Sequence, residues 1–336
     1  MAAVNGIFYM YTMALTVGET IQGTMVKEAT MRQYLRAAAL FTKSVGQRQL
    51  CPITDPSTGK WFEPIEKCLR EFKKWEQMPN RRSPLTKRMV RDLMEHCKDF
   101  HEDSKEQAFV DWCILGLHMG YRRIEWATDK APKHRTDFHR ADDANKSIYQ
   151  VLLDDLILIG PDGARVRNEL TYPASQLKGA QITVRFQKNQ NNGEVVTQAA
   201  NPKDTTFCCP RAIQRIKQRA ARLGMKGHEP ASAYRANRKS KHPSFFHSKT
   251  IKDLLSSMGR RTHKSLDLNA DNLKSTGHSV RVGAAVLMHA AHSPTHDIQK
   301  RLRWMSDSFS FYLRDMPQLA INHMRMFSQA DVDSWS

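Results

Sequence analysis

Hydrophobic positions recur with the period of an α-helix along most of this chain. In residues 28–46, Leu35 and Ala38 mark one helix face, and Thr30 is the expected N-cap. Ser104 is the expected start of a strongly apolar helix that follows it. Helices with the same apolar period are expected in residues 7–17, 61–78, 85–100, 103–121, 210–223, 248–258, 281–291 and 297–303.

A few segments have the pattern of β-strands instead. Residues 181–187 alternate polar and apolar side chains, residues 188–193 are expected to turn, and residues 194–197 continue as the partner strand. Residues 150–158 are also strand-like, and residues 227–248 are expected to form a loop. The sequence therefore predicts a mainly α protein with a small antiparallel β-sheet, an α+β fold.

A segment with two prolines and two arginines, at residues 78–84, interrupts the helical pattern. It predicts a helical domain at 1–80, a linker at 81–84 and a larger domain at 85–336. The helices of the first domain are charged but include no cluster of reactive side chains. We expect this domain to clamp a ligand and the larger one to carry the chemistry.

The charge of the chain is strongly unbalanced. Its 336 residues have a formal net charge of +18, and residues 201–250 hold twelve Lys or Arg against only Asp204 and Glu229. A folded protein this basic is expected to bind a polyanion, and nucleic acid is the first candidate. A solvated basic face is the alternative explanation.

The cations of this region fall into two groups. Arg215, Arg219 and Arg222 line one face of the helix expected at 210–223, and we predict that they contact DNA. A nuclear-import signal in the following loop would explain its charges equally well. The cations of that loop for which DNA contact is predicted are Arg235, Arg238, Lys239 and Lys241.

The cysteines and histidines predict neither disulfides nor metal. Six cysteines without framework spacing indicate reduced thiols in an intracellular protein, nuclear in a eukaryotic host and otherwise in the cytoplasm or nucleoid. Cys97 with His101, or the histidines of residues 289–296, lack a second ligand pair at zinc-finger spacing. We expect no metal, no small-molecule cofactor and no membrane partner, since apolar residues 7–17 are too few to span a bilayer.

A short region near the C-terminus collects the groups needed to break a phosphodiester. A phosphate gains negative charge as a fifth oxygen approaches phosphorus, and the guanidinium of Arg281 is a planar cation suited to that charge. The indole of Trp304 can donate a hydrogen bond, and His278 can accept a proton. Tyr312 offers an oxygen nucleophile that needs such help, because a free phenol has a pKa near 10.

The order of these residues resembles the tyrosine recombinases of the phage-integrase superfamily, most closely the Crypton-type branch encoded by transposons. The resemblance covers roughly residues 84–316. It assigns the first catalytic arginine to Arg122, in the run Gly120–Glu125, with Glu125 as its supporting acid. It assigns the catalytic lysine to Lys188, in the turn expected between two strands. The family's second box is His278 to Arg281, followed by Trp304 and the nucleophile Tyr312.

Two positions depart from the family pattern. The glycine usual before Trp304 is replaced, giving Leu302-Arg303-Trp304. The turn at residues 292–295, where the family commonly has glycine or small residues, begins with His292. Neither change removes a charge or a proton carrier, so an intact active site is expected.

The resemblance implies a site-specific recombinase or integrase that cleaves and rejoins double-stranded DNA through a 3′-phosphotyrosine, without metal or ATP. In it Lys188 would protonate the departing 5′ oxygen, and the protein would act as a homotetramer on DNA while being a monomer or dimer free in solution. Two alternatives stay open. A type IB topoisomerase would use the same chemistry to relax DNA, and an inactive or domesticated derivative would bind DNA only.

Overall fold

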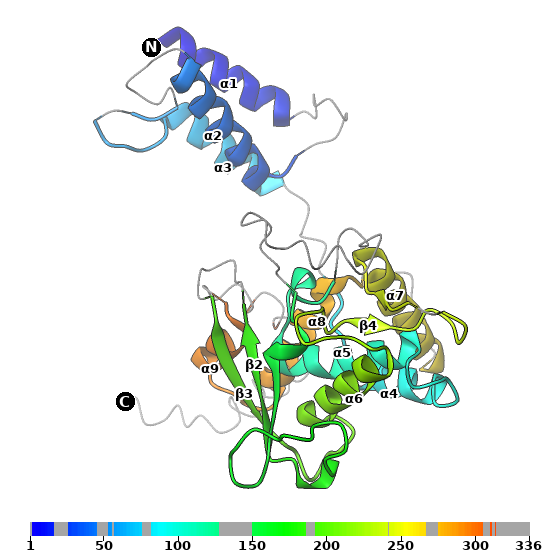
Figure 1. Cartoon of the computed structure of the whole chain (residues 1–336). Coiled ribbons are helices and arrows are strands. Elements are labelled where there is room, and N and C mark those ends of the chain that lie inside the picture. Colours follow the sequence, from blue (N-terminus) through cyan, green and yellow to red (C-terminus); the bar gives the residue numbers. More distant parts are fainter. Residues whose placement is uncertain are drawn as a thin grey trace, which may run out of the picture. The chain divides into compact units, whose positions relative to one another are not determined.

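The computed structural model divides the chain into two compact units, Met1–Asn80 and Arg81–Ser336 (Figure 1). Each unit is described by itself. Across both units, the structure describes residues 2–16, 26–45, 53–55, 57–75, 82–127, 150–185, 192–240, 242–266, 275–304, 310 and 313.

The first unit is built from three helices, α1 (Ala2–Thr16), α2 (Glu28–Val45) and α3 (Glu63–Trp75). Their apolar faces meet in a small core around Met31, Leu35 and Leu69, each of which is fully buried. The prediction that Thr30 caps α2 is wrong, because the helix begins at Glu28 and Thr30 lies inside its first turn. The apolar period marks the face of a helix better than its first residue.

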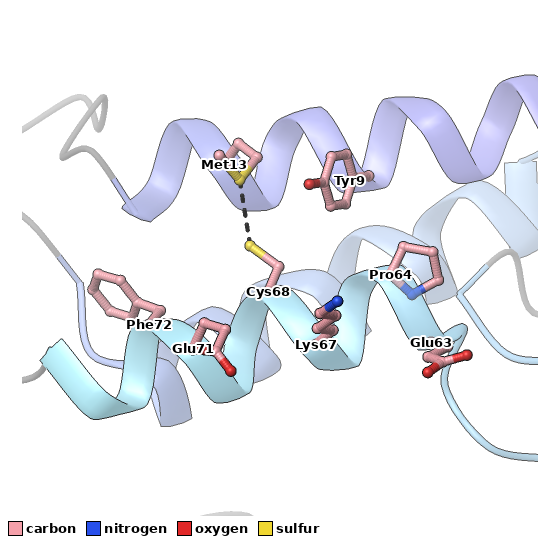
Figure 2. A pocket seen from close by; sticks show the side chains of 8 residues that line it. All are labelled: Tyr9, Met13, Glu63, Pro64, Lys67, Cys68, Glu71 and Phe72. Atoms are coloured by element: carbon pink, nitrogen blue, oxygen red, sulfur yellow. Dashed lines mark hydrogen bonds between the residues drawn. The ribbon is translucent and has the colours of Figure 1, made fainter.

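A groove of about 740 Å³ runs between α1 and α3 (Figure 2). Cys68 of α3 and Met13 of α1 point toward each other across it, with a thiol-to-thioether distance of 3.4 Å. Partial burial raises the pKa of the Cys68 thiol, which keeps it protonated and unreactive at neutral pH. Both apolar and charged side chains line the groove, and its thiol is not activated.

The second unit is centred on α5 (Lys105–Met119), whose residues are mostly buried. Ser104 is its N-cap, as predicted, because its hydroxyl accepts a hydrogen bond from the backbone N–H of Gln107 at 3.2 Å. The surrounding helices are α4 (Lys87–His96), α6 (Cys209–Arg222), α7 (Ser248–Ser265), α8 (Gly277–Ala290) and α9 (Thr295–Leu302).

The β-structure of this unit is small. Strands β1 (Leu156–Ile159), β2 (Gly179–Val184) and β3 (Glu194–Ala199) form an antiparallel sheet in that order, with β2 and β3 side by side in Figure 1. The prediction of a strand throughout 150–158 is wrong at its start, since Leu153–Asp155 forms the 3₁₀ turn η3. A second 3₁₀ turn, η4, spans Ala174–Gln176.

The region expected to be a loop contains a short hairpin that the sequence analysis missed. Strands β4 (Ala233–Tyr234) and β5 (Ser244–Phe245) pair antiparallel within it. Phe246, directly after β5, is fully buried against Phe109 of α5 and Trp126. This aromatic cluster packs the first half of α5 against Trp126, which lies in the segment that follows the helix.

The observed class is the predicted one: mainly α, with a small antiparallel sheet, an α+β fold. Among the described helices, none has both the length and the apolar character needed to cross a bilayer.

Candidate active site

The N-terminus of α8 presents two of the predicted site residues. Thr276 precedes the helix, and its hydroxyl accepts from the N–H of His278 at 3.3 Å while its own N–H donates to the hydroxyl of Ser279 at 2.9 Å. This reciprocal capping fixes the first turn of the helix. Arg281 lies one turn from the cap and is 5% exposed, and its Nη1 donates to the carbonyl of Gly120 at 2.8 Å.

Arg122 enters the same region from the end of α5. Gly120 ends that helix in the left-handed conformation, at φ 55°, and an added Cβ there would lie 2.6 Å from a methyl carbon of Leu302. Glycine meets both constraints without strain, so the chain can turn here and α9 can pack closely. Arg122 then precedes the 3₁₀ turn η1 (Arg123–Glu125).

Glu125 holds Arg122 at two points. One carboxylate oxygen accepts from the Arg122 backbone N–H at 2.9 Å, and the other accepts from its Nη1 at 3.2 Å. Glu125 is 1% exposed, so the carboxylate is paired rather than solvated. Glu125 therefore fixes both the backbone and the side chain of Arg122.

Arg303 also lies in the site. The sequence indicated only that it replaces a glycine of the family pattern. Its carbonyl oxygen accepts from Nη2 of Arg122 at 3.2 Å and from Nη2 of Arg281 at 3.1 Å. Its buried guanidinium donates to Glu125 at 2.8 Å. Three arginines from distant parts of the sequence therefore meet around one carbonyl and one carboxylate.

Trp304 and His278 complete the described cluster. The guanidinium carbon of Arg281 lies 4.8 Å from the centre of the Trp304 ring, within cation–π range. The His278 ring lies 6.4 Å from that of Trp304, at 51°. Burial, then the charges of Arg281 and Arg82, lower the pKa of His278, which favours the neutral imidazole at neutral pH.

Two further cations lie at this site. Arg82, which the sequence analysis placed in the linker, is exposed and close enough to His278 to lower its pKa. Arg123 packs its side chain against the start of α8, where a Cβ added to Gly277 would lie 3.0 Å from its Cγ. The sequence offered one signal for each residue: Arg123 directly follows Arg122, and Arg82 lies in the segment 78–84 with its two prolines and two arginines.

Among the described residues of the cluster, the arginines outnumber the carboxylates. Arg122, Arg281 and Arg303 bring three permanent positive charges, and Glu125 supplies the one carboxylate that the described residues pair with them. Planar guanidinium donors that are partly buried and gathered in one place suit an anion with several oxygens, such as a phosphate ester. Within the described chain, no group of three His, Cys, Asp or Glu side chains has a metal-binding arrangement.

Three of the predicted residues lie outside the described residues: Lys188, Lys241 and Tyr312. The residue after Tyr312 is described. Leu313 is 7% exposed and packs with Leu302 and Ile298 in a cluster to which Trp304 also contributes.

The arginines of α6 do not form the exposed row that was expected. Arg219 is 3% exposed and donates to Asp111 of α5 at 2.6 Å, and Arg215 donates to the other oxygen of the same carboxylate at 2.6 Å. Arg222 pairs with Asp103 at 2.8 Å. The guanidinium of Arg219 is buried and cannot face a phosphate backbone. The prediction that Arg219 contacts DNA is therefore wrong, and the residue belongs to the core.

The cations of the loop after α6 divide in the same way. Arg235 is partly buried and donates to the carbonyl of Ser240 at 2.8 Å. Arg238 and Lys239 are exposed at the tip of the segment between β4 and β5. Of the described residues in this predicted set, these two are the exposed ones.

Replacing Glu125 with glutamine is expected to destabilise the second unit by about 3–5 kcal/mol, because Arg303 would keep its buried charge without a charged partner. Guanidinium denaturation followed by tryptophan fluorescence would measure this, since Trp112 and Trp126 are buried nearby. The matched control is Glu95→Gln, whose ion pair with Lys98 is exposed and is worth at most about 1 kcal/mol. Equal midpoints for the two variants would contradict the buried pairing.

Neither a protein-family model nor a curated protein sequence matches this chain. Among solved structures, it is similar to a Tn1549 transposon integrase in complex with circular-intermediate DNA, at 12% identity and a TM-score of 0.45, covering 96% of this chain and 85% of that one. XerA recombinase is similar at 12% identity and a TM-score of 0.39, with 96% and 90% covered. XerH recombinase bound to its difH substrate is similar at 12% identity and a TM-score of 0.38, with 90% and 71% covered. The similarity to these structures is one of fold alone.

Proposed function

We propose that this chain is a tyrosine recombinase that cleaves and rejoins double-stranded DNA. The observation that carries the proposal is the meeting of Arg122 and Arg281 at the carbonyl of Arg303, with His278 and Trp304 beside them. These residues come from three separate segments, and the fold gathers them around one small volume. The guanidinium groups gathered there fit the phosphate of a DNA strand.

The arginines act on the charge of the phosphate. Arg281 is held by the carbonyls of Gly120 and Arg303, and Arg122 is held by Glu125 and Arg303. Because these bonds fix both guanidiniums before DNA arrives, little reorganisation is needed when the pentacoordinate phosphorus gains charge. The Arg122 side chain is 21% exposed, which leaves it accessible to a ligand.

The proposed reaction begins at Tyr312. Its phenolic oxygen attacks phosphorus, the bond from phosphorus to the 5′ oxygen breaks, and a 3′-phosphotyrosine forms. Neutral His278 accepts the phenolic proton, and Lys188 donates a proton to the departing 5′ oxygen. Attack by a 5′ hydroxyl then reverses these steps and releases the tyrosine. The roles of Tyr312 and Lys188 rest on the family resemblance, and the lowered pKa of His278 suits a proton acceptor.

The remaining parts of the proposal concern the larger assembly. Arg238 and Lys239 are proposed to contact the DNA backbone, and the helices of the first unit are proposed to grip the duplex. A homotetramer on DNA and membership of the Crypton-type branch follow from the resemblance alone.

A nicked DNA duplex tests the proposal directly. Cleavage near the nick lets a short fragment diffuse away, so a covalent protein–DNA adduct accumulates and is seen on a denaturing gel. Wild-type protein is expected to form this adduct. Absence of any adduct would leave a DNA-binding protein without catalysis, and efficient relaxation of plasmid by a lone monomer would favour a topoisomerase.

Adduct formation is expected to slow in acid, with a midpoint below pH 6.5, the ordinary pKa of histidine. Burial and two cations lower the pKa of His278, so its neutral, proton-accepting form persists until the pH falls below that value. Arg82→Gln removes one cation, so the pKa should rise and the loss of rate should begin at higher pH. Single-turnover rates between about pH 5 and 8 would show the shift.

The control for this experiment is Arg88→Gln in α4, because Arg88 is exposed and pairs with Asp92. That variant should keep the wild-type midpoint. An acid limb that stays in place in Arg82→Gln would contradict the role of His278 as the group that titrates.

A further inference from the structure

Arg303 has a backbone conformation that favours glycine. It ends α9 at φ 56° and ψ 49°, where its N–H reaches the carbonyls of Gln299 and Lys300. A side chain at such angles clashes with the backbone and costs free energy that glycine avoids. Among the described non-glycine residues, positive φ occurs at His292 and Arg303. At both positions this sequence lacks the glycine or small residue of the family pattern.

The side chain of Arg303 adds a second cost. It is 1% exposed, and Glu125 is its one charged partner among the described residues. Its Nε and Nη1 are buried without a hydrogen-bond partner in the part of the chain that the structure describes. Glycine would serve the turn without strain and without a buried charge, so stability alone does not account for an arginine here.

The two ends of Arg303 act on the same pair of guanidiniums. Its carbonyl accepts from Arg122 at 3.2 Å and from Arg281 at 3.1 Å. Its guanidinium donates at 2.8 Å to Glu125, which in turn holds the backbone and Nη1 of Arg122. The guanidinium carbon also lies 5.8 Å from the centre of the Tyr121 ring, within cation–π range.

We propose that Arg303 is a positioning residue that holds Arg122 and Arg281 in the geometry needed to bind a phosphodiester. The inference rests on the proposed DNA-cleaving function. Arg303 touches no reacting atom itself and acts through Glu125 and through its own carbonyl. The left-handed turn sets the direction of the Arg303 carbonyl, and the buried ion pair with Glu125 anchors that turn. The carbonyl contacts and the ion pair therefore act together on Arg122 and Arg281.

Two variants separate this role from that of a helix end. Arg303→Met keeps a long side chain and removes the charge. Arg303→Gly also removes the charge but relieves the strained backbone. A residue that merely ends α9 should be improved by glycine, whereas a positioning residue should fail in both variants. Arg301→Met is the matched control, since Arg301 lies in the same helix but donates to the carbonyl of Thr197.

The first measurement is single-turnover cleavage of the nicked duplex at saturating DNA, together with DNA affinity. Both Arg303 variants are expected to cleave about 100-fold more slowly than wild type, as for a misplacement on the order of 1 Å. Their Kd for DNA should stay within about threefold, because no phosphate contact of the exposed surface is removed. Arg301→Met should match wild type in both quantities.

The second measurement needs no DNA. The ¹⁵N-labelled full chain gives guanidinium Nε–H signals, and Arg122→Lys and Arg281→Lys identify the two of interest. These signals should shift or broaden in Arg303→Met and Arg303→Gly and stay unchanged in Arg301→Met. If neither neutral variant folds, Arg303→Lys keeps a charge opposite Glu125 and should show smaller changes of the same kind, because lysine lacks the planar fork.

Wild-type-like cleavage by Arg303→Gly, with unchanged Arg122 and Arg281 signals, would overturn the inference. If wild-type protein forms no adduct at all, the proposed function fails instead. The guanidinium signals then decide the role of Arg303 by themselves: altered signals support it as the holder of the two arginines, and unchanged signals refute it.

Discussion

Protein carrying Tyr312→Phe is expected to bind duplex DNA as tightly as wild type and to form no covalent adduct. Phenylalanine lacks the oxygen that would join phosphorus, while the arginine cluster that binds the phosphate is unchanged. The single-turnover rate on a nicked duplex should therefore fall by a factor on the order of 10⁴ or more. A denaturing gel measures the adduct, and a mobility-shift titration measures the affinity.

The matched control is Tyr172→Phe, since Tyr172 is a partly buried tyrosine that packs on the core of the second unit. Its adduct should form at the wild-type rate. An adduct in Tyr312→Phe would show that another residue attacks the DNA, and the chemical assignment would then be wrong.

Arg281→Ala is expected to lower the rate of adduct formation by about 10²–10³-fold, the range found when one preorganised donor is removed from an anion site. Arg281 is 5% exposed and is fixed by the carbonyls of Gly120 and Arg303, so its charge is already in place when DNA arrives. DNA affinity depends on many phosphate contacts and should fall much less than the rate. Rate and affinity are measured in parallel, from single-turnover cleavage and from titration.

A second substitution at the same position sharpens the test. Arg281→Lys keeps a charge but loses the planar fork that reaches two carbonyls, so an intermediate rate is expected. Arg88→Ala, at an exposed ion pair of α4, controls for the loss of an arginine as such. If Arg281→Ala weakened binding and cleavage by the same factor, Arg281 would be a binding residue without a special part in the reaction.

The sequence predicted most elements of the fold because their signals are local. The apolar period and Ser104 located α5, and the alternation around residues 181–197 located the pairing of β2 with β3. The start of α2 was misplaced because the same period gives no first residue. The β4–β5 hairpin was missed because two residues per strand are too few to show alternation.

The residues of the candidate site were predicted by their order in the chain, and the structure brings together Arg122, Glu125, His278, Arg281 and Trp304. What order does not predict is a partner far away in sequence. Arg219 has the spacing of a surface row, yet its partner Asp111 lies 108 positions earlier and draws it into the core.

Arg303 shows the same limit at the centre of the site. Its ion pair with Glu125 spans 178 positions, and the sequence displayed only the loss of a glycine. The structure adds that Arg303 keeps the left-handed conformation that a glycine would adopt there. A non-glycine residue in the left-handed conformation is strained, so the contacts of its side chain are the place to look for its role.

Mass mapping of the trapped adduct tests the central claim most directly. Wild-type protein would be reacted with a nicked duplex and digested with a protease and a nuclease, and the peptide carrying a residual nucleotide would be sequenced. The predicted result is a 3′-linked nucleotide on Tyr312. A nucleotide on any other residue, or a wild-type protein that binds the duplex and never becomes linked to it, would contradict the account.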